Sequence, residues 1–132
     1  MSLYTFKQRI QYLRKAKNRH GIHSPFVYRL IDKCLLSGDG DLYGERLPAY
    51  FGKEHLVLLK QDPAKWKEQS AALNNERVLI VPGIHKTPQH TEQWDALVAD
   101  ERILLTIDLF DAGLLINREE FKEKQHFVLK TK

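Results

Sequence analysis

Histidines, a lone cysteine and one serine are the residues of this chain that could do chemistry by their type. Two histidine pairs have spacings that a metal could use, His20-x2-His23 and His85-x4-His90. Three further residues could join them only in space: Cys34, His55 and His126. No CxxC or HExxH pattern accompanies the pairs, and histidines near helix starts more often cap or hydrogen-bond, so we expect no metal site.

Two side chains near a histidine qualify by position as nucleophiles, Ser24 and Cys34. Ser24 precedes Pro25 and is predicted to cap a helix, which occupies its oxygen. Cys34 falls on an apolar helix face, where a thiol behaves as a small hydrophobe. We therefore assign no catalytic residue. A single cysteine forms no internal disulfide and suits a reducing compartment, so the expected location is cytoplasmic.

Positive charge is concentrated at the N-terminal end of the chain. Residues 1–36 hold eight Lys or Arg against one acid, a net +7, whereas residues 37–132 hold thirteen against sixteen, a net −3. Such a basic arm can bind nucleic acid, an acidic protein, or the acidic half of its own chain. The candidate binding residues are Lys15, Lys17 and Arg19.

Two helices are predicted within residues 1–36. Apolar residues at spacings of three and four draw one stripe for burial along the first helix: Leu3, Phe6, Ile10 and Leu13. This helix should end between Asn18 and Gly21. The second should begin at Ser24-Pro25 and bury Val27, Leu30 and Cys34 with their apolar neighbours. We expect an N-terminal helical hairpin.

Residues 37–54 are rich in turn formers and contain Gly38, Gly40 and Gly44. A phosphate-binding glycine loop needs a buried strand before it and a helix after it, and neither flank fits. We interpret 37–54 as a linker.

From residue 55 the pattern alternates between apolar runs of strand length and helices, which Asp62-Pro63 and Thr87-Pro88 are predicted to cap. The five expected strands are 55–60, 77–81, 102–110, 112–116 and 126–130. Continuous rather than alternating apolar strands predict a mostly parallel sheet that is covered on both faces. The fold class is therefore α/β, with residues 55–132 as an α/β half-domain in one folding unit with the rest.

The stretches "KAKNRHGIHSPFVY" (15–28) and "ERILLTIDLFDAGLLINREEFKEKQHFVL" (101–129) resemble the opening and the end of small bacterial S-adenosylmethionine-dependent methyltransferases of class I. The resemblance implies a Rossmann-like sheet in which 102–110 and 112–116 are the antiparallel closing strands. In that family a glycine-rich turn after the first strand and an acid after the second hold the cofactor.

By the same resemblance, the strands present are the fourth to the seventh of the family, and the cofactor-binding half is missing between Leu36 and His55. Pro82 and Gly83 stand where the family has an acidic pair before "IH", and Lys60-Gln61 where an acid is expected. We therefore expect a catalytically inactive remnant that binds no cofactor and acts as an interaction module.

Two alternatives stay open: a methyltransferase that binds S-adenosylmethionine after completion by homo-oligomerisation, and a nucleic-acid-binding protein that uses the basic arm. The resemblance implies that the His20–Ser24 corner covers the cofactor pocket of intact relatives. His20, His23 and His85 are then the candidate cofactor contacts.

A sheet that begins at residues 55–60 exposes unpaired backbone groups beside apolar side chains. We expect this edge to be covered, either by the N-terminal helices or by a second copy, and we predict that two copies pair along it as a homodimer. No apolar block has signal-peptide or membrane-spanning length, so we expect no membrane partner.

Overall fold

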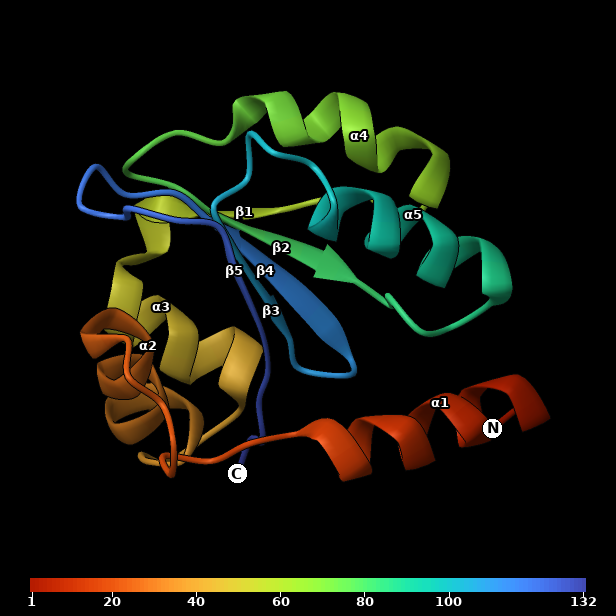
Figure 1. The fold of residues 1–132 in the computed structure, drawn as a ribbon, viewed down its shortest axis with the longest axis horizontal. Helices are drawn as coiled ribbons and strands as arrows, with labels where there is room; N and C mark the ends of the chain where they lie inside the picture. Colours follow the sequence, from red (N-terminus) through yellow and green to blue (C-terminus); the bar gives the residue numbers. More distant parts are fainter.

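One mixed sheet of five strands lies at the centre of the molecule (Figure 1). The computed structural model describes residues 1–132. The strands are β1 (Leu56–Leu58), β2 (Val78–Pro82), β3 (Leu105–Asp108), β4 (Ala112–Ile116) and β5 (Gln125–Val128), in the order β1-β2-β4-β3-β5. All five strands lie within or overlap the predicted ranges, and the α/β class is confirmed.

The sheet is mixed rather than mostly parallel. Strands β1 and β2 are parallel, as are β3 and β5, but β4 is antiparallel to both of its neighbours, β2 and β3. The cause is the three-residue connection between β3 and β4, which is too short for a crossover and reverses the chain. The predicted antiparallel pairing of these two strands is confirmed.

Five α-helices surround the sheet: α1 (Leu3–Lys15), α2 (Pro25–Leu30), α3 (Leu47–Phe51), α4 (Trp66–Gln69) and α5 (Pro88–Val98). A π-helical turn continues α2 through Ile31–Leu35, and another, Leu42–Arg46, leads into α3. Short 3₁₀ turns occupy Lys53–His55, Pro63–Lys65 and Ser70–Ala72. None of the helices combines the length and apolar character needed to cross a bilayer.

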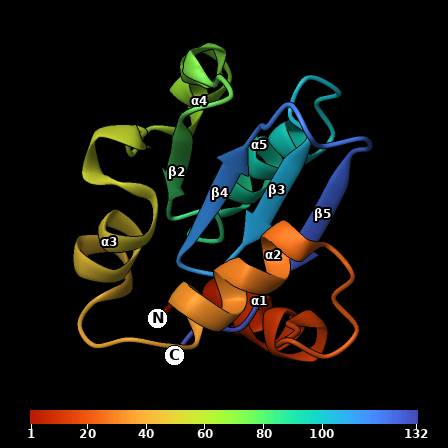
Figure 2. The same cartoon turned by 90° about the vertical axis from the view of Figure 1, so that its left-hand side faces the viewer.

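Both faces of the sheet are covered, as predicted. One face packs against α4 and α5, through Trp66, Trp94 and Leu97. The opposite face packs against α2, α3 and the π-helical turns, with Leu30 and Leu47 among the buried residues (Figures 1 and 2). The sheet is therefore the middle layer of three.

Two predicted caps start the helices that flank the sheet. The Ser24 hydroxyl accepts a hydrogen bond from the Val27 amide at 3.2 Å, with Pro25 as the first helical residue. The Thr87 hydroxyl accepts one from the His90 amide at 3.2 Å. These local rules hold because a cap needs only residues within one turn of it.

The N-terminal helices do not form the expected hairpin. Helix α1 ends at Lys15, and residues 16–24 carry the chain away, so that α1 and α2 lie one after the other rather than side by side (Figure 1). The reason is the next segment: the Lys17 amide donates to Val128 O, and Lys17 O accepts from the Lys130 amide. This bridge to the C-terminal strand ends the helix early.

The stripe predicted for burial on α1 is exposed. Leu3, Phe6 and Leu13 are 70%, 54% and 54% exposed, and Ile10 is 36% exposed. Tyr12, on the opposite side of the helix, is the only buried residue of α1. The apolar periodicity predicted the presence of this helix correctly, but not which of its faces packs against the protein.

Residues 37–54 are part of the folded unit, not a linker. Leu42 and Leu47 lie in the core, and Arg46 is 7% exposed. The Arg46 guanidinium donates to Cys34 O at 2.8 Å, Leu35 O at 3.0 Å and Lys132 O at 3.0 Å, and two longer bonds reach Ser37 O and Gly40 O. A run of turn-forming residues thus folds around one buried side chain.

We predict that Arg46→Met lowers the free energy of unfolding by about 3 kcal/mol, because several buried carbonyls lose their donor. Arg46→Lys should recover only part of this, since one ammonium lacks the forked geometry of a guanidinium. Urea unfolding followed by circular dichroism measures both. The exposed Arg14→Met is the control, with a change within about 0.5 kcal/mol. Equal stability of the Arg46→Met and Arg14→Met variants would contradict the assigned role.

Candidate functional site

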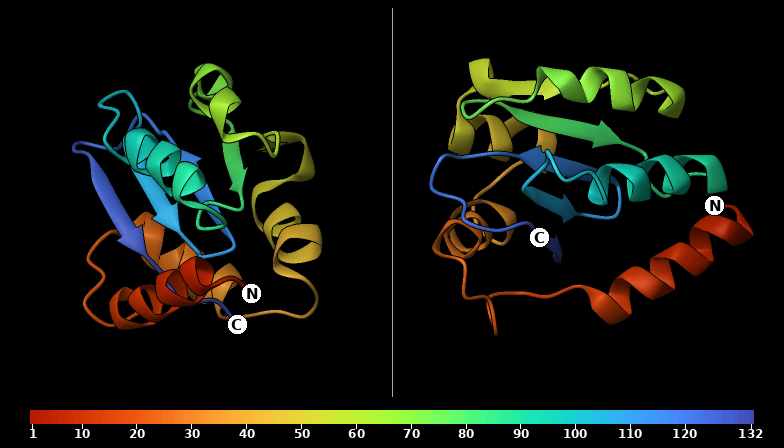
Figure 3. Two further views of the ribbon diagram at one scale, coloured as in Figure 1. Left: turned by 90° about the vertical axis from the view of Figure 1, so that its right-hand side faces the viewer. Right: turned by 45° about the horizontal axis from the view of Figure 1, so that its top comes forward.

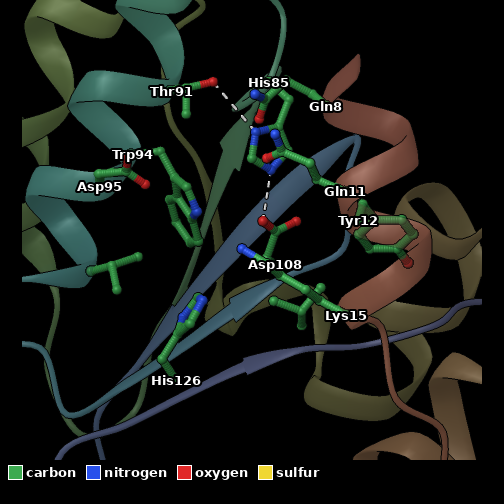
Figure 4. A pocket seen from close by; sticks show the side chains of 12 residues that line it. Gln8, Gln11, Tyr12, Lys15, His85, Thr91, Trp94, Asp95, Asp108 and His126 are labelled. Carbon is green, nitrogen blue, oxygen red and sulfur yellow. Dashed lines mark hydrogen bonds and ion pairs between the residues drawn. The ribbon is translucent and has the colours of Figure 1, made fainter. Parts of the chain in front are cut away.

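A polar cavity of about 270 Å³ opens at the carboxyl ends of β2 and β3, where ligands bind in open α/β sheets (Figure 4). Its walls come from α1, α5 and the ends of β3 and β5. The polar or aromatic side chains that line it are Gln8, Gln11, Tyr12, Lys15, His85, Thr91, Trp94, Asp95, Asp108 and His126. We call it the His–Asp cavity.

The centre of the His–Asp cavity is a nearly buried hydrogen-bonded pair. His85 follows β2 after a turn at Gly83, whose φ is +63°, and Asp108 is the last residue of β3. Their side chains are 10% and 9% exposed, and His85 Nε2 lies 2.6 Å from Asp108 Oδ2. The other carboxylate oxygen, Oδ1, accepts the Phe110 amide at 2.8 Å.

The hydrogen-bond pattern assigns the ring nitrogens of His85. A carboxylate only accepts, so Nε2 carries the hydrogen that is donated to Asp108. The Thr91 hydroxyl lies 3.4 Å from His85 Nδ1 but donates to Ile84 O at 3.1 Å. When His85 is neutral, Nδ1 therefore has a free lone pair. A general base that is oriented by a carboxylate requires this arrangement.

Phe110 forms the floor beneath this pair and has an unusual backbone. It is the only non-glycine residue with positive φ, at 71°, a conformation that is strained for a bulky side chain. Its ring stacks on His85 with centroids 5.6 Å apart and packs against Tyr12 at 5.4 Å, while the Arg9 guanidinium carbon lies 4.8 Å from its centroid. The tight β3–β4 turn thus sets the position of the imidazole.

Tyr12 joins α1 to the body of the protein at this cavity. Its hydroxyl donates to Leu129 O at 2.5 Å. Burial raises the pKa of Tyr12 to about 12, so the hydroxyl keeps its proton and stays a donor at neutral pH.

His126 and Asp95 complete the polar wall. His126 Nδ1 lies 2.8 Å from Thr106 Oγ1, and burial lowers the pKa of the imidazole. Loss of water raises the pKa of Asp95, although the nearby His85 acts in the opposite direction. Both shifts favour the uncharged form of these groups. No set of three or more His, Cys, Asp or Glu side chains lies close enough to hold a metal ion.

The predicted cofactor contacts are not brought together. His85 lies in the His–Asp cavity, whereas His23 lines a different cavity of about 440 Å³ beside Arg29 and Glu120. His20 is exposed. The corner at residues 20–24 therefore does not line the cavity that contains His85. Cys34 is buried in the core, and burial raises its thiol pKa to about 11, which agrees with the expectation that it is not activated.

The basic arm is partly neutralised within itself. Arg19 Nε lies 2.9 Å from Asp32 Oδ1 and lowers the pKa of that carboxyl through their hydrogen bond. The backbone of Lys17 pairs with the C-terminal strand, although its side chain is exposed. Lys15 lines the His–Asp cavity. The three residues thus differ in their surroundings: the Arg19 side chain is ion-paired, Lys17 pairs through its backbone, and Lys15 lines a cavity.

A second surface lies at the outer edge of β1. This strand has one neighbour, β2, and Leu58 is 66% exposed at its end. A cavity of about 490 Å³ lies beside it, with Leu56, Leu58 and Ile80 in its wall. We call this combination the β1 edge.

Sequence reasoning missed Asp108, Thr91 and Phe110. One signal was available, because Asp108 is an acid at the end of the buried run "RILLTID". An ionisable residue that ends a buried strand lies where ligands bind in α/β sheets. Nothing in the sequence indicates that Asp108 faces His85 rather than another strand end.

Comparisons of the chain with protein-family models, with curated proteins and with solved structures find no match. The function of this chain is therefore inferred from its fold, the His–Asp cavity and the β1 edge.

The partly desolvated imidazole of His126 predicts a pH dependence of stability. Its pKa is lowered in the folded state from the ordinary 6.5, so the unfolded chain binds this proton more readily. The contribution is fully present above pH 6.5 and is lost as the pH falls below it. Urea unfolding between about pH 7.5 and about pH 5 should show a smaller pH dependence for His126→Asn than for the wild type. Identical pH dependence in the two proteins would contradict the prediction.

Proposed function

We propose that this chain is a remnant of a class I methyltransferase fold, without the half that binds S-adenosylmethionine, and that it acts as a homodimeric interaction module. The observation that carries the proposal is the β1 edge. The first strand of the chain lies at the edge of the sheet, and residues 1–55 in front of it contain helices and turns but no strand of the sheet. A glycine turn between a strand and a helix therefore has no place before β1.

The strand ends give further support. Lys60 follows β1, and Pro82-Gly83 end β2, so these two ends present no carboxylate where the resemblance requires acids. The antiparallel pairing of β3 with β4 fits the closing strands that the resemblance implies.

The β1 edge favours a second copy as partner. Two edges related by a two-fold axis join into one continuous sheet and satisfy their free backbone groups. Because β1 pairs over only three residues, these hydrogen bonds are few. The exposed Leu58 and the apolar cavity beside it supply the surface that a stable dimer also has to bury.

We predict a dimer that depends on Leu58. Light scattering after size-exclusion chromatography should give twice the monomer mass for the wild type, and the monomer mass for Leu58→Lys, because a lysine at an edge opposes pairing. Leu13→Lys, an equally drastic change at another exposed leucine, should stay dimeric. A wild type that is monomeric at all concentrations would refute the proposal.

A second candidate is a methyltransferase completed by this self-association. The observation that favours it is the His85–Asp108 pair, whose free Nδ1 could accept a proton from a methyl acceptor in the His–Asp cavity. Methyl transfer also requires the donor to be held in line, and a second subunit would have to supply those contacts.

Calorimetric titration with S-adenosylmethionine and S-adenosylhomocysteine separates the two candidates. We expect no binding heat from either compound, because the cofactor-holding turn has no place in the chain. Heat at micromolar concentrations that disappears in monomeric Leu58→Lys would instead favour the completed enzyme.

A further inference from the structure

Helix α1 presents an apolar face to the outside of the molecule, and this face has no partner within the chain. Five of the seven exposed large apolar side chains of the protein belong to α1 or precede it: Met1, Leu3, Phe6, Ile10 and Leu13. Helix α1 lies at the outer boundary of the molecule, with its N-terminal end away from the core (Figures 1 and 3). A contiguous exposed apolar patch that polar residues border can mark an interaction site.

Basic side chains border this face on both sides. Lys7 and Arg14 follow Leu3 and Ile10 by four residues, which places them along one flank of the stripe. Arg9 stands on the other flank, three residues after Phe6, where it also covers the Phe110 ring. The first acidic residue of the chain is Asp32, so α1 carries no negative charge.

A second copy is a poor partner for this face. Two α1 helices face to face would bring Lys7, Arg9 and Arg14 of both copies together. A helix of 13 residues offers a footprint of about 20 Å by about 10 Å, or about 200 Å². Stable dimers bury about 800 Å² on each partner. The positive charge of the flanks favours an anionic partner, and the small footprint of the helix favours an extended surface over a second copy.

We propose that α1 binds the surface of an anionic lipid bilayer, with its apolar stripe among the acyl chains and its basic flanks at the headgroup phosphates. The lack of a membrane-spanning block does not oppose this, because a helix in the interface plane needs none. Tyr12 and its bond to Leu129 hold the opposite side of α1 on the protein, so the stripe is free while the fold stays intact. The inference is independent of dimerisation at the β1 edge.

Co-sedimentation of the full chain with vesicles tests the proposal. We expect binding to vesicles of phosphatidylcholine with phosphatidylglycerol, little binding to phosphatidylcholine alone, and a steep loss with salt. The double variant Phe6→Gln/Leu13→Gln should bind at least about tenfold more weakly, because it removes half of the stripe. Lys7→Gln/Arg14→Gln should lose the preference for anionic vesicles. Tyr28→Gln, a matched change at an exposed aromatic of α2, should bind like the wild type.

A fluorescent probe gives a second readout that does not depend on removing the stripe. Both native tryptophans are buried, so Phe6→Trp adds the only exposed one. Its emission should shift to the blue with anionic vesicles, whereas that of Tyr28→Trp should not.

Three results would overturn the proposal: no binding to anionic vesicles, equal binding of the stripe variant and the wild type, or a blue shift of both probes. Retention of a nucleic acid or an acidic protein by the flank residues, without vesicle binding, would assign α1 to that partner instead. Loss of the dimer in Phe6→Gln/Leu13→Gln but not in Leu58→Lys would assign the stripe to a second copy.

Discussion

The buried guanidinium of Arg46 is the interaction on which the arrangement of this fold depends. It binds carbonyls at the end of the first π-helical turn and the carbonyl of Lys132, which are far apart in the sequence. A π-helical turn leaves carbonyl groups without their usual hydrogen-bond partners. Burying these carbonyls unpaired would cost free energy of folding. By satisfying them, one side chain keeps residues 31–54 packed on the sheet.

The His–Asp cavity depends on a second constraint, the reversal between β3 and β4. Strand β4 lies between β2 and β3, and it contains Gly113, where a Cβ atom would come within 2.3 Å of the Trp94 ring. A glycine there lets α5 approach the sheet closely enough for Trp94 to line the cavity. The turn itself uses Asp108 to bind the Phe110 amide, so the residue that holds His85 also holds the loop beneath it.

The sequence predicted what is decided locally. The caps at Ser24 and Thr87 and the existence of five strands follow from residue types within a few positions. The prediction that the apolar stripe of α1 is buried was wrong. Amphipathicity shows that a helix has an apolar and a polar face, but not which face packs against the rest of the protein. The pairing of His85 with Asp108 could not be predicted, since it depends on the position of β4 between their strands. The prediction of a linker at residues 37–54 was wrong, because the turn-forming residues of this range fold around the buried side chain of Arg46.

The two tryptophans lie in one layer of the molecule, since Trp66 and Trp94 both belong to the core between the sheet and helices α4 and α5. The opposite core holds tyrosines and phenylalanines but no indole. Intrinsic indole emission therefore reports the loosening of one side of the protein only. A melting curve recorded by fluorescence and one recorded by backbone dichroism would coincide if the layers separate together, and would diverge if the side that contains Arg46 opens first.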